Sequence, residues 1–299
     1  MPMTEPRTDS GPSTVSVAAP PVDDLVVARR RGLSSRLGDV VESSWRPLLL
    51  LVALVVAWWA LSASGLVAPY LLPSPAQVLD ELVTEWEFLA AHTSVTAYET
   101  VIGFALAAVL GLLAAVAIVY SRTVEKTLYP LLLFAQVIPK IAIAPLFVVW
   151  LGFGPTPKIL VAILIAFFPV VIDGVAGFRS VDPEMLDLSA TMGATRLQTF
   201  RKIRFPAALP HIFSGLKVAA TLAVVGAVVG EFVGANEGLG YVLLIANGNL
   251  NGPLLWAGLL IMSLLGIVLF LAIEIAERLL LPWHASRRAE AVTSASTAM

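Results

Sequence analysis

Three ionisable residues lie inside or at the end of long apolar segments of the chain. Lys140 lies near the middle of one segment, Asp173 lies in the next, and Glu231 ends a later one. In a bilayer such residues mark substrate pathways or pair with one another. Lys140 and Asp173 are predicted either to form a buried ion pair or to line a translocation path, where Lys140 would attract an anionic substrate. Glu231 is predicted to be a hydrated helix end or a gate residue of that path.

The stretch DLSATMGATRLQTFRKIRFPAALP, residues 187–210, is polar and basic although apolar segments flank it. Just before it, Asp182 is a favoured N-cap residue and Pro183 is favoured at the first helical position. We therefore expect a short helix from Pro183 to about Met192. Gly193 can adopt the left-handed conformation that ends a helix.

A second short helix is expected directly after this glycine. Thr195 and Gln198 have the spacing of a capping box. Pro206 and Pro210 are expected to break the helix before the next apolar segment begins. One face of the helix would be an apolar stripe and the remainder would be basic. These residues are Leu197, Phe200 and Ile203 on the stripe, and Arg196, Arg201, Lys202 and Arg204 around it.

The loop that contains these two helices is predicted to be an ordered projection over residues 183–205. Ordering a loop costs about 1–2 kcal/mol per residue in backbone entropy. A rigid projection therefore indicates a docking site for another molecule. The alternative is that the basic residues only follow the positive-inside rule, which accounts for their charge but not for two capped helices.

The motifs of several enzyme classes are absent from the sequence. There is no GxxxxGK[ST] phosphate loop, so the chain is not expected to bind ATP by that route, and no GxSxG nucleophile. There is no cysteine, and His92, His211 and His284 lie far apart, so no metal site and no cofactor are expected. The basic residues lie at segment edges, which argues against nucleic-acid binding. The chain is therefore not predicted to be an enzyme.

The composition identifies the elements that must position these residues. Hydrophobic residues make up 58% of the 299 residues and charged residues only 13%. Apolar runs of about 20 residues cross a bilayer as helices. The fold class is therefore predicted to be an all-α integral membrane protein with six transmembrane helices. The candidate spans are 46–66, 95–119, 127–151, 158–178, 209–232 and 253–281.

The basic residues predict which side of the membrane each loop faces, because cytoplasmic loops are enriched in Lys and Arg. An even number of spans puts both termini on one side, and the basic residues predict that this side is the cytoplasm. Lys140 and Lys158 depart from the rule, and Lys217 can snorkel from the inner part of the fifth span. The residues that follow the rule are Arg29, Arg30, Arg31, Arg36, Arg46, Arg122, Lys126, Arg179, Arg196, Arg201, Lys202, Arg204, Arg278, Arg287 and Arg288.

The spans define a membrane domain over residues 45–282, with a cytoplasmic loop at 180–206. Residues 1–44 are rich in Pro, Ser, Thr, Asp and Arg and are predicted to be a disordered cytoplasmic tail. Residues 283–299 are predicted to be a second cytoplasmic tail. On the outer side, Ser74 and Pro75 are predicted to start an amphipathic helix with acidic residues between its apolar positions.

The third span contains Pro139 and Pro145, each of which removes a backbone donor and can bend a helix. Together with Gly152 and Gly154, a kinked helix would suit a pore wall that moves. The alternative is the ordinary enrichment of proline and glycine in membrane helices.

The loop resembles the cytoplasmic loop of permease subunits of binding-protein-dependent ABC importers. That signature reads Glu-Ala-Ala, three residues, Gly, nine residues, Ile, one residue, Leu-Pro. Phe205 stands for its Leu, and a shorter acid and a leucine replace its first two residues. The positions that carry the resemblance are Asp187, Leu188, Ser189, Gly193, Ala194, Thr195, Ile203 and Pro206.

Other stretches are similar to the nitrate, sulfonate and taurine branch of these permeases. They are LPSPAQVLDEL, IPKIAIAPLFVVWLGFG, FPAALPHIFSGLK and GLGYVLL. The stretch IPKIAIAPLF is also similar to the corresponding stretch in permeases for riboflavin and for thiamine-precursor pyrimidines. The resemblance implies a type I ABC importer permease that forms the pore for one of these solutes in the plasma membrane.

The resemblance also implies partners. An ATP-binding ABC subunit would receive the loop as a coupling helix, an extracytoplasmic solute-binding protein would deliver substrate, and two copies of the chain would form a homodimer in membrane lipid. The rival function is a stand-alone secondary transporter, but such proteins usually contain internal repeats, and none is evident in this sequence.

Overall fold

The structure is a computed structural model that describes residues 33–281 of the chain. The chain divides into two compact units, Met1–Leu49 and Leu50–Met299. Most of the predicted N-terminal tail and all of the predicted tail over 283–299 lie outside the described residues. Residues 33–44 are an exception, because the first helix begins at Leu33 rather than after the predicted tail.

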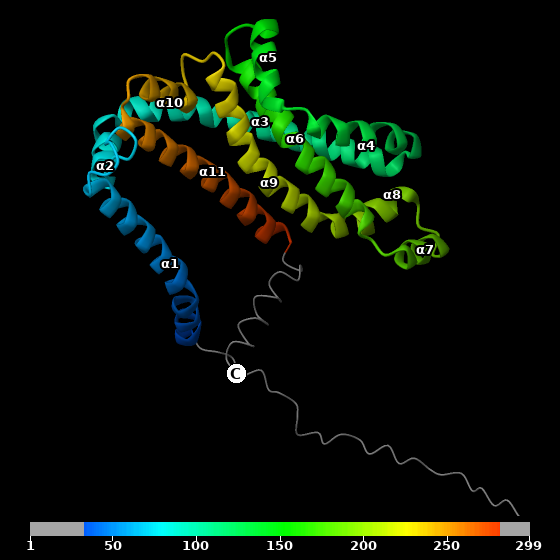
Figure 1. Cartoon of the computed structure of the whole chain (residues 1–299). Helices are drawn as coiled ribbons and strands as arrows, with labels where there is room; N and C mark the ends of the chain where they lie inside the picture. Colours follow the sequence, from blue (N-terminus) through cyan, green and yellow to red (C-terminus); the bar gives the residue numbers. More distant parts are fainter. Residues whose placement is uncertain (1–32, 282–299) are drawn as a thin grey trace, which may run out of the picture. The chain divides into compact units, whose positions relative to one another are not determined.

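The described residues form helices joined by short turns, without strands (Figure 1). The α-helices are α1 Leu33–Ala63, α2 Pro75–Thr84, α3 Trp86–Tyr120, α4 Arg122–Val137, α5 Ala144–Leu151, α6 Pro155–Arg179, α7 Pro183–Thr191, α8 Arg196–Thr199, α9 Phe205–Phe232, α10 Leu239–Gly248 and α11 Gly252–Leu280. A 3₁₀ helix, η2 Lys140–Ile143, and a π helix, η3 Phe200–Arg204, connect α4 to α5 and α8 to α9.

Four helices of the described chain are long and apolar enough to cross a membrane, and a bent pair raises this to five. The four helices agree with the predicted spans at 95–119, 158–178, 209–232 and 253–281. In the region of the predicted first span, the apolar stretch Leu48–Ala63 is shorter. The chain is thus an all-helical, multi-pass membrane protein.

The third predicted span, 127–151, is broken rather than straight. The pair Arg122–Val137 and Lys140–Leu151 bends by 87°. Ile138 is extended, with φ −65° and ψ 128°, because the following Pro139 disfavours the helical conformation of the residue before it. The predicted proline kink is therefore present, and it is sharp enough to divide the span into two helices.

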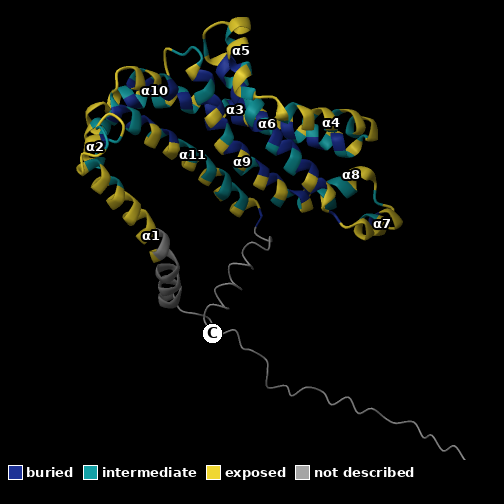
Figure 2. Ribbon diagram, viewed as in Figure 1, coloured by how far each residue is buried: buried dark blue, intermediate teal, exposed yellow. Residues whose placement is uncertain are grey.

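The core of the second unit lies where α3, α6 and α9 pack together, and Figure 2 shows buried residues along α6 and α9. Glycines allow these backbones to approach, as is common between membrane helices. A Cβ at Gly226 would lie 2.6 Å from Ala162 Cα, and one at Gly230 would lie 2.7 Å from Lys158 Cα. A Cβ at Gly103 would lie 2.6 Å from Ala162 Cβ. Small residues thus fix how closely the three helices pack.

The predicted helix after Ser74 is confirmed as α2. The Ser74 hydroxyl accepts from Gln77 N and the Gln77 side chain accepts from Ser74 N, which completes a capping box. Within the second unit, Trp58 holds the carboxyl-terminal part of α1 in place. Trp58 stacks on Trp256 of α11 with ring centroids 5.1 Å apart and donates a hydrogen bond to Pro73 O.

Candidate functional site

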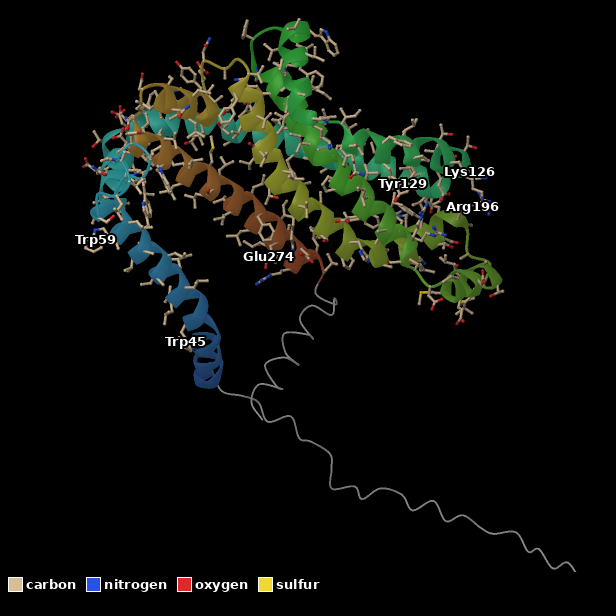
Figure 3. The ribbon with its side chains drawn as sticks, viewed as in Figure 1. Trp45, Trp59, Lys126, Tyr129, Arg196 and Glu274 are labelled. Atoms are coloured by element: carbon tan, nitrogen blue, oxygen red, sulfur yellow. The ribbon has the colours of Figure 1, made fainter. Side chains whose placement is uncertain are left out.

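Two regions at opposite ends of the α6–α9 pair contain the predicted loop residues and Glu231, whereas Lys140 and Asp173 lie between these ends. We name the end where α6 finishes and α7 and α8 lie the loop end. We name the end where α6 begins and α9 finishes the α10 end. Figure 3 shows Lys126, Tyr129 and Arg196 at the loop end. Arg179 at the same end pairs with Glu125 at 2.5 Å.

The first predicted loop helix is confirmed as α7. Its N-cap is Asp182, whose side chain accepts from Glu184 N at 2.9 Å. Gly193 has φ +75°, the left-handed conformation that the sequence predicted for the helix end. Ala194 N then donates to Ser189 O at 3.0 Å, which closes the turn.

The second predicted helix begins as expected with a capping box. Gln198 N donates to Thr195 Oγ1 at 3.3 Å, and Thr195 N donates to Gln198 Oε1 at 2.8 Å. Ser189 and Thr199 approach to 3.3 Å between their hydroxyl oxygens, which links α7 to α8. The two loop helices therefore form one ordered corner.

The predicted break before the next span is not found. Residues 196–232 form one helical run, with Pro206 near the start of α9 and Pro210 inside it. The π helix η3 lies just before the prolines, and Phe205 N donates to Phe200 O, five residues back. A π turn shifts the hydrogen-bond register of a helix, so the missing proline donor does not end the run.

The predicted apolar stripe of the second helix is divided between a packed residue, Phe200, and an exposed residue, Leu197. Phe200 packs on Phe178 and Tyr120, with centroids 5.6 and 5.4 Å away, and holds the loop against α3 and α6. Leu197 is 65% exposed. It belongs to an exposed apolar set that we name the loop surface and that consists of Met185, Leu188, Met192 and Leu197.

Lys140 and Asp173 are both present near the core helices but do not pair with each other. Lys140 Nζ donates to Gln136 O at 3.2 Å and lies 4.7 Å from the centroid of the Phe168 ring. No ion pair joins Lys140 to Asp173 within the described residues, so the ion-pair alternative was wrong, and the alternative that they line a translocation path stays a prediction. The break in the span explains the difference, because Lys140 starts η2 and turns back to the carboxyl end of α4.

Glu231 is fully buried, which corrects the expectation of a hydrated helix end. Thr96 Oγ1 donates to Glu231 Oε1 at 2.6 Å, and Gly240 N donates to Glu231 Oε2 at 2.5 Å. Leu239 N donates to Thr96 Oγ1, and Gly238 N donates to His92 Nδ1. These side chains satisfy the free N–H groups at the start of α10.

Gly238 is required at this position for two reasons. Its φ is +105°, and an added Cβ would collide with the Glu231 carboxylate. The sequence signal for this cap was therefore Glu231 followed by Gly238-Leu239-Gly240. It could not be interpreted without knowing that α9 and α10 fold back on each other.

A buried ion pair that the sequence did not predict lies beside this cap. Lys158 Nζ is 3.0 Å from Glu99 Oε1, with 8% and 1% of the two side chains exposed. In the sequence, Lys158 stood out only as a lysine that departs from the positive-inside rule. Because α3 and α6 pack side by side, the two residues meet at the α10 end.

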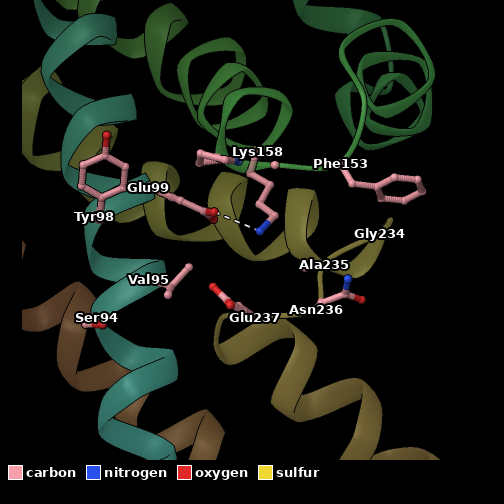
Figure 4. A pocket seen from close by; sticks show the side chains of 12 residues that line it. Ser94, Val95, Tyr98, Glu99, Phe153, Lys158, Gly234, Ala235, Asn236 and Glu237 are labelled. Carbon is pink, nitrogen blue, oxygen red and sulfur yellow. Dashed lines mark ion pairs between the residues drawn. The ribbon is translucent and has the colours of Figure 1, made fainter.

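A pocket of about 500 Å³ opens at the α10 end (Figure 4). Its wall comes from the first half of α3, the turn between α5 and α6, the start of α6, and the loop between α9 and α10. In the described part of the chain, no group of three or more His, Cys, Asp and Glu residues is placed to hold a metal. The polar and aromatic lining residues are Ser94, Tyr98, Glu99, Phe153, Lys158, Asn236 and Glu237.

The family described as binding-protein-dependent transport system inner membrane component matches residues 107–282. This range includes the loop end, the broken span and the part of the α10 cap that Glu231 and Gly238 contribute. It begins inside α3 and covers more than half of the chain.

Three curated relatives cover most of this chain. The formylaminopyrimidine transport permease protein ThiX of Halalkalibacterium halodurans is 42% identical over 239 residues, 80% of this chain and 95% of the relative. The riboflavin transport system permease protein RibX of Chloroflexus aurantiacus is 37% identical over 85% of this chain and 97% of its own length. The putative aliphatic sulfonates transport permease protein SsuC of Bacillus subtilis is 33% identical over 81% and 89%.

A solved structure has a similar fold. A chain of the MetNI methionine ABC transporter, in an inward-facing conformation, superposes with a TM-score of 0.57 at 21% identity. The match covers 64% of this chain and 94% of that chain. At this identity the likeness concerns the arrangement of the helices.

Proposed function

The chain belongs to the family of binding-protein-dependent transport system inner membrane components, and from this premise we propose how its two ends work. It is a multi-pass membrane permease of an ABC importer. We assign it the pore for a small solute, with ATP hydrolysis in a separate subunit that docks on the loop surface. The solute would arrive at the α10 end from an extracytoplasmic binding protein.

The loop surface is the observation that carries this proposal. Met192 is 79% exposed and Leu188 61% exposed, although exposed apolar clusters are unfavourable in water. The N-caps of α7 and α8 and the Ser189–Thr199 contact order the backbone that carries these side chains. A preformed apolar surface on a rigid corner is the kind of surface on which a partner protein docks.

Charge supports the orientation with the loop end in the cytoplasm. Basic residues gather at the loop end, whereas the exposed ionised residues near the α10 end are acidic within the described chain. Cytoplasmic loops of membrane proteins carry the excess of Lys and Arg. The acidic residues in question are Asp80, Glu85, Glu87 and Glu237.

A second copy of the chain would complete the pore. Large apolar side chains of the broken span, such as Val149 at 78% and Phe134 at 73%, are exposed and require lipid or protein cover. One copy with four or five long spans encloses little space of its own. Lipid would cover the remaining apolar surface.

The relatives favour a nitrogen-containing heterocycle as the solute. Those named for formylaminopyrimidine and riboflavin are 42% and 37% identical, whereas relatives named for sulfonates and taurine are 33% and 31% identical. We therefore rank a heterocycle above the sulfonate or taurine that the sequence motifs first indicated. A nitrate-like anion ranks below both.

Site-directed crosslinking tests the docking of an ATP-binding subunit. The chain contains no cysteine, so each single-cysteine variant provides one unique attachment point. Leu188→Cys and Leu197→Cys are expected to crosslink to the ATP-binding subunit in native membranes. Leu79→Cys, which is 62% exposed on α2, serves as the matched control and is expected to give no such product.

Uptake by reconstituted liposomes tests the energy source. The permease with an ATP-binding subunit and a binding protein is expected to take up solute only when ATP is supplied. If the chain alone drives uptake from an ion gradient, it is a secondary transporter and the proposal is wrong. If the loop cysteines never capture the ATP-binding subunit, the assignment of the loop surface is wrong.

A further inference from the structure

The pocket at the α10 end is large enough for a small organic molecule. Its volume of about 500 Å³ lies within the range of small-molecule sites. Two aromatic side chains on its wall, Tyr98 and Phe153, are 57% and 79% exposed. The pocket therefore offers aromatic surface on which a planar ring can stack.

The charges of the wall are unsuited to an anion. One lysine faces two glutamates, which leaves an excess negative charge. Glu99 already neutralises Lys158 at 3.0 Å, and Glu237 is exposed at the pocket. A nitrate or sulfonate group would therefore find no unpaired cation on this lining and would be repelled by a carboxylate.

One buried carboxylate oxygen on the wall has no hydrogen-bond donor. Lys158 Nζ lies 3.0 Å from Glu99 Oε1 and supplies a charged N–H group to that oxygen, whereas Glu99 Oε2 is buried and accepts no hydrogen bond within the described chain. An unsatisfied buried acceptor is costly. A ligand that brings an N–H group to the base of the pocket would remove this cost. Figure 4 shows Glu99 and Lys158 meeting there, with Glu237 and Asn236 across from them.

We infer that this pocket is an entry site for the transported solute and that it selects a planar ring with N–H donors and no net negative charge. The inference rests on the proposed function, since entry from this side requires the proposed orientation. The ring would stack on Tyr98 or Phe153. Its donors would face Glu99 and Glu237, and Asn236 offers both a donor and an acceptor.

Equilibrium binding to the assembled permease and ATP-binding complex in lipid nanodiscs tests the inference, without any binding protein present. Formylaminopyrimidine is the ring probe and taurine is the sulfonate probe. The wild-type complex is expected to bind the ring. Tyr98→Ala and Glu237→Gln are each expected to weaken that binding about tenfold, because each removes one direct contact from an exposed side chain.

The matched controls change the same residue types elsewhere. Tyr70→Ala removes a tyrosine that is 48% exposed, and Glu87→Gln removes an exposed carboxylate, and neither residue lines the pocket. Both are expected to bind the ring as the wild type does. Glu99→Gln is an informative further variant only if it elutes as an assembled complex, because its ion pair is buried.

Three results would overturn the inference. They are absence of ring binding to the wild type, equal binding by pocket and control variants, and taurine binding that the pocket variants weaken as much. The uptake assay separates this failure from failure of the proposed function. ATP-driven uptake of any solute keeps the importer assignment, even when the pocket variants bind and transport normally.

Discussion

At the scale of single residues, the α10 end combines groups that need each other. Glu231, Thr96 and His92 satisfy three successive N–H groups at the start of α10. Glu99 and Lys158 neutralise each other nearby at very low exposure. Removing one member of such a set leaves a buried group unpaired, and that penalty exceeds the value of the lost contact itself.

Breaking the Lys158–Glu99 pair is therefore expected to be strongly destabilising. Lys158→Met leaves the buried Glu99 carboxyl group without its counter-charge, and we expect a loss of about 3–5 kcal/mol in unfolding free energy. Adding Glu99→Gln to Lys158→Met should recover part of this loss. The measurement is unfolding in mixed detergent micelles.

The control for that experiment is the ion pair between Glu274 and Arg278, in which Arg278 is 64% exposed. Arg278→Met is expected to cost at most about 1 kcal/mol, because surface pairs are worth little. Equal losses at the two pairs would contradict the role assigned to burial.

Gly238→Ala is expected to destabilise the α10 cap. The residue has a positive φ and the new Cβ would press on the Glu231 carboxylate, so we expect a cost of about 1–3 kcal/mol. Gly248→Ala is the control, since nothing lies within 4 Å of its added Cβ. Thermal unfolding compares the two variants. If Gly238→Ala unfolds at the same temperature as Gly248→Ala, Glu231 does not need the space that the structure reserves for it.

At the scale of helices, short-range signals and long-range ones differ in how far the sequence reveals them. The caps of α2, α7 and α8 depend on residues two or three positions apart, so Ser74, Asp182 and Thr195 could be identified directly. The partners of Glu99 and Glu231 come from other helices, and no local pattern encodes those distances. The Lys140–Asp173 ion pair is absent for a related reason, because the sequence indicated a kink but not that it bends the span by 87°.

Thr195→Ala is expected to loosen the start of α8. Loss of an N-cap side chain costs about 1 kcal/mol, so the amide of Gln198 should exchange with solvent about fivefold faster. Hydrogen exchange read by mass spectrometry measures this. Thr221→Ala is the control, because the Thr221 hydroxyl only returns to Val218 O of its own helix. Equal exchange rates in the two variants would mean that the capping box does not order the corner.

At the scale of the molecule, close glycine contacts set how α3, α6 and α9 assemble. At Gly226, an added Cβ would meet backbone atoms of Ala162, which cannot move aside as a flexible side chain can. The sequence contains these glycines in plain view, but ordinary glycine enrichment in membrane helices hides which ones face a neighbour. Only the packed structure distinguishes Gly226 from Gly266, beside which there is more space.

Gly226→Ala is expected to disturb this assembly. Overpacking a tight contact costs about 1–3 kcal/mol, so the variant should unfold at a lower temperature and give a less monodisperse peak in size-exclusion chromatography. Gly266→Ala should behave as the wild type or slightly better, since alanine favours helix more than glycine does. Destabilisation of both variants alike would indicate that glycine flexibility, and not close packing, is the reason for both residues.

The uninterrupted run from Arg196 to Phe232 has a mechanical consequence. Its 37 residues make a stiff rod of about 55 Å, with Leu197 near one tip and Glu231 near the other. Such a helix transmits rotation as well as translation. The number of residues between Leu197 and Glu231 therefore fixes how the two side chains are oriented about the helix axis relative to each other. Inserting one residue in its middle would turn the far tip by about 100° and carry the Glu231 carboxylate away from Thr96 and Gly240, although every side chain of the original sequence would still be present.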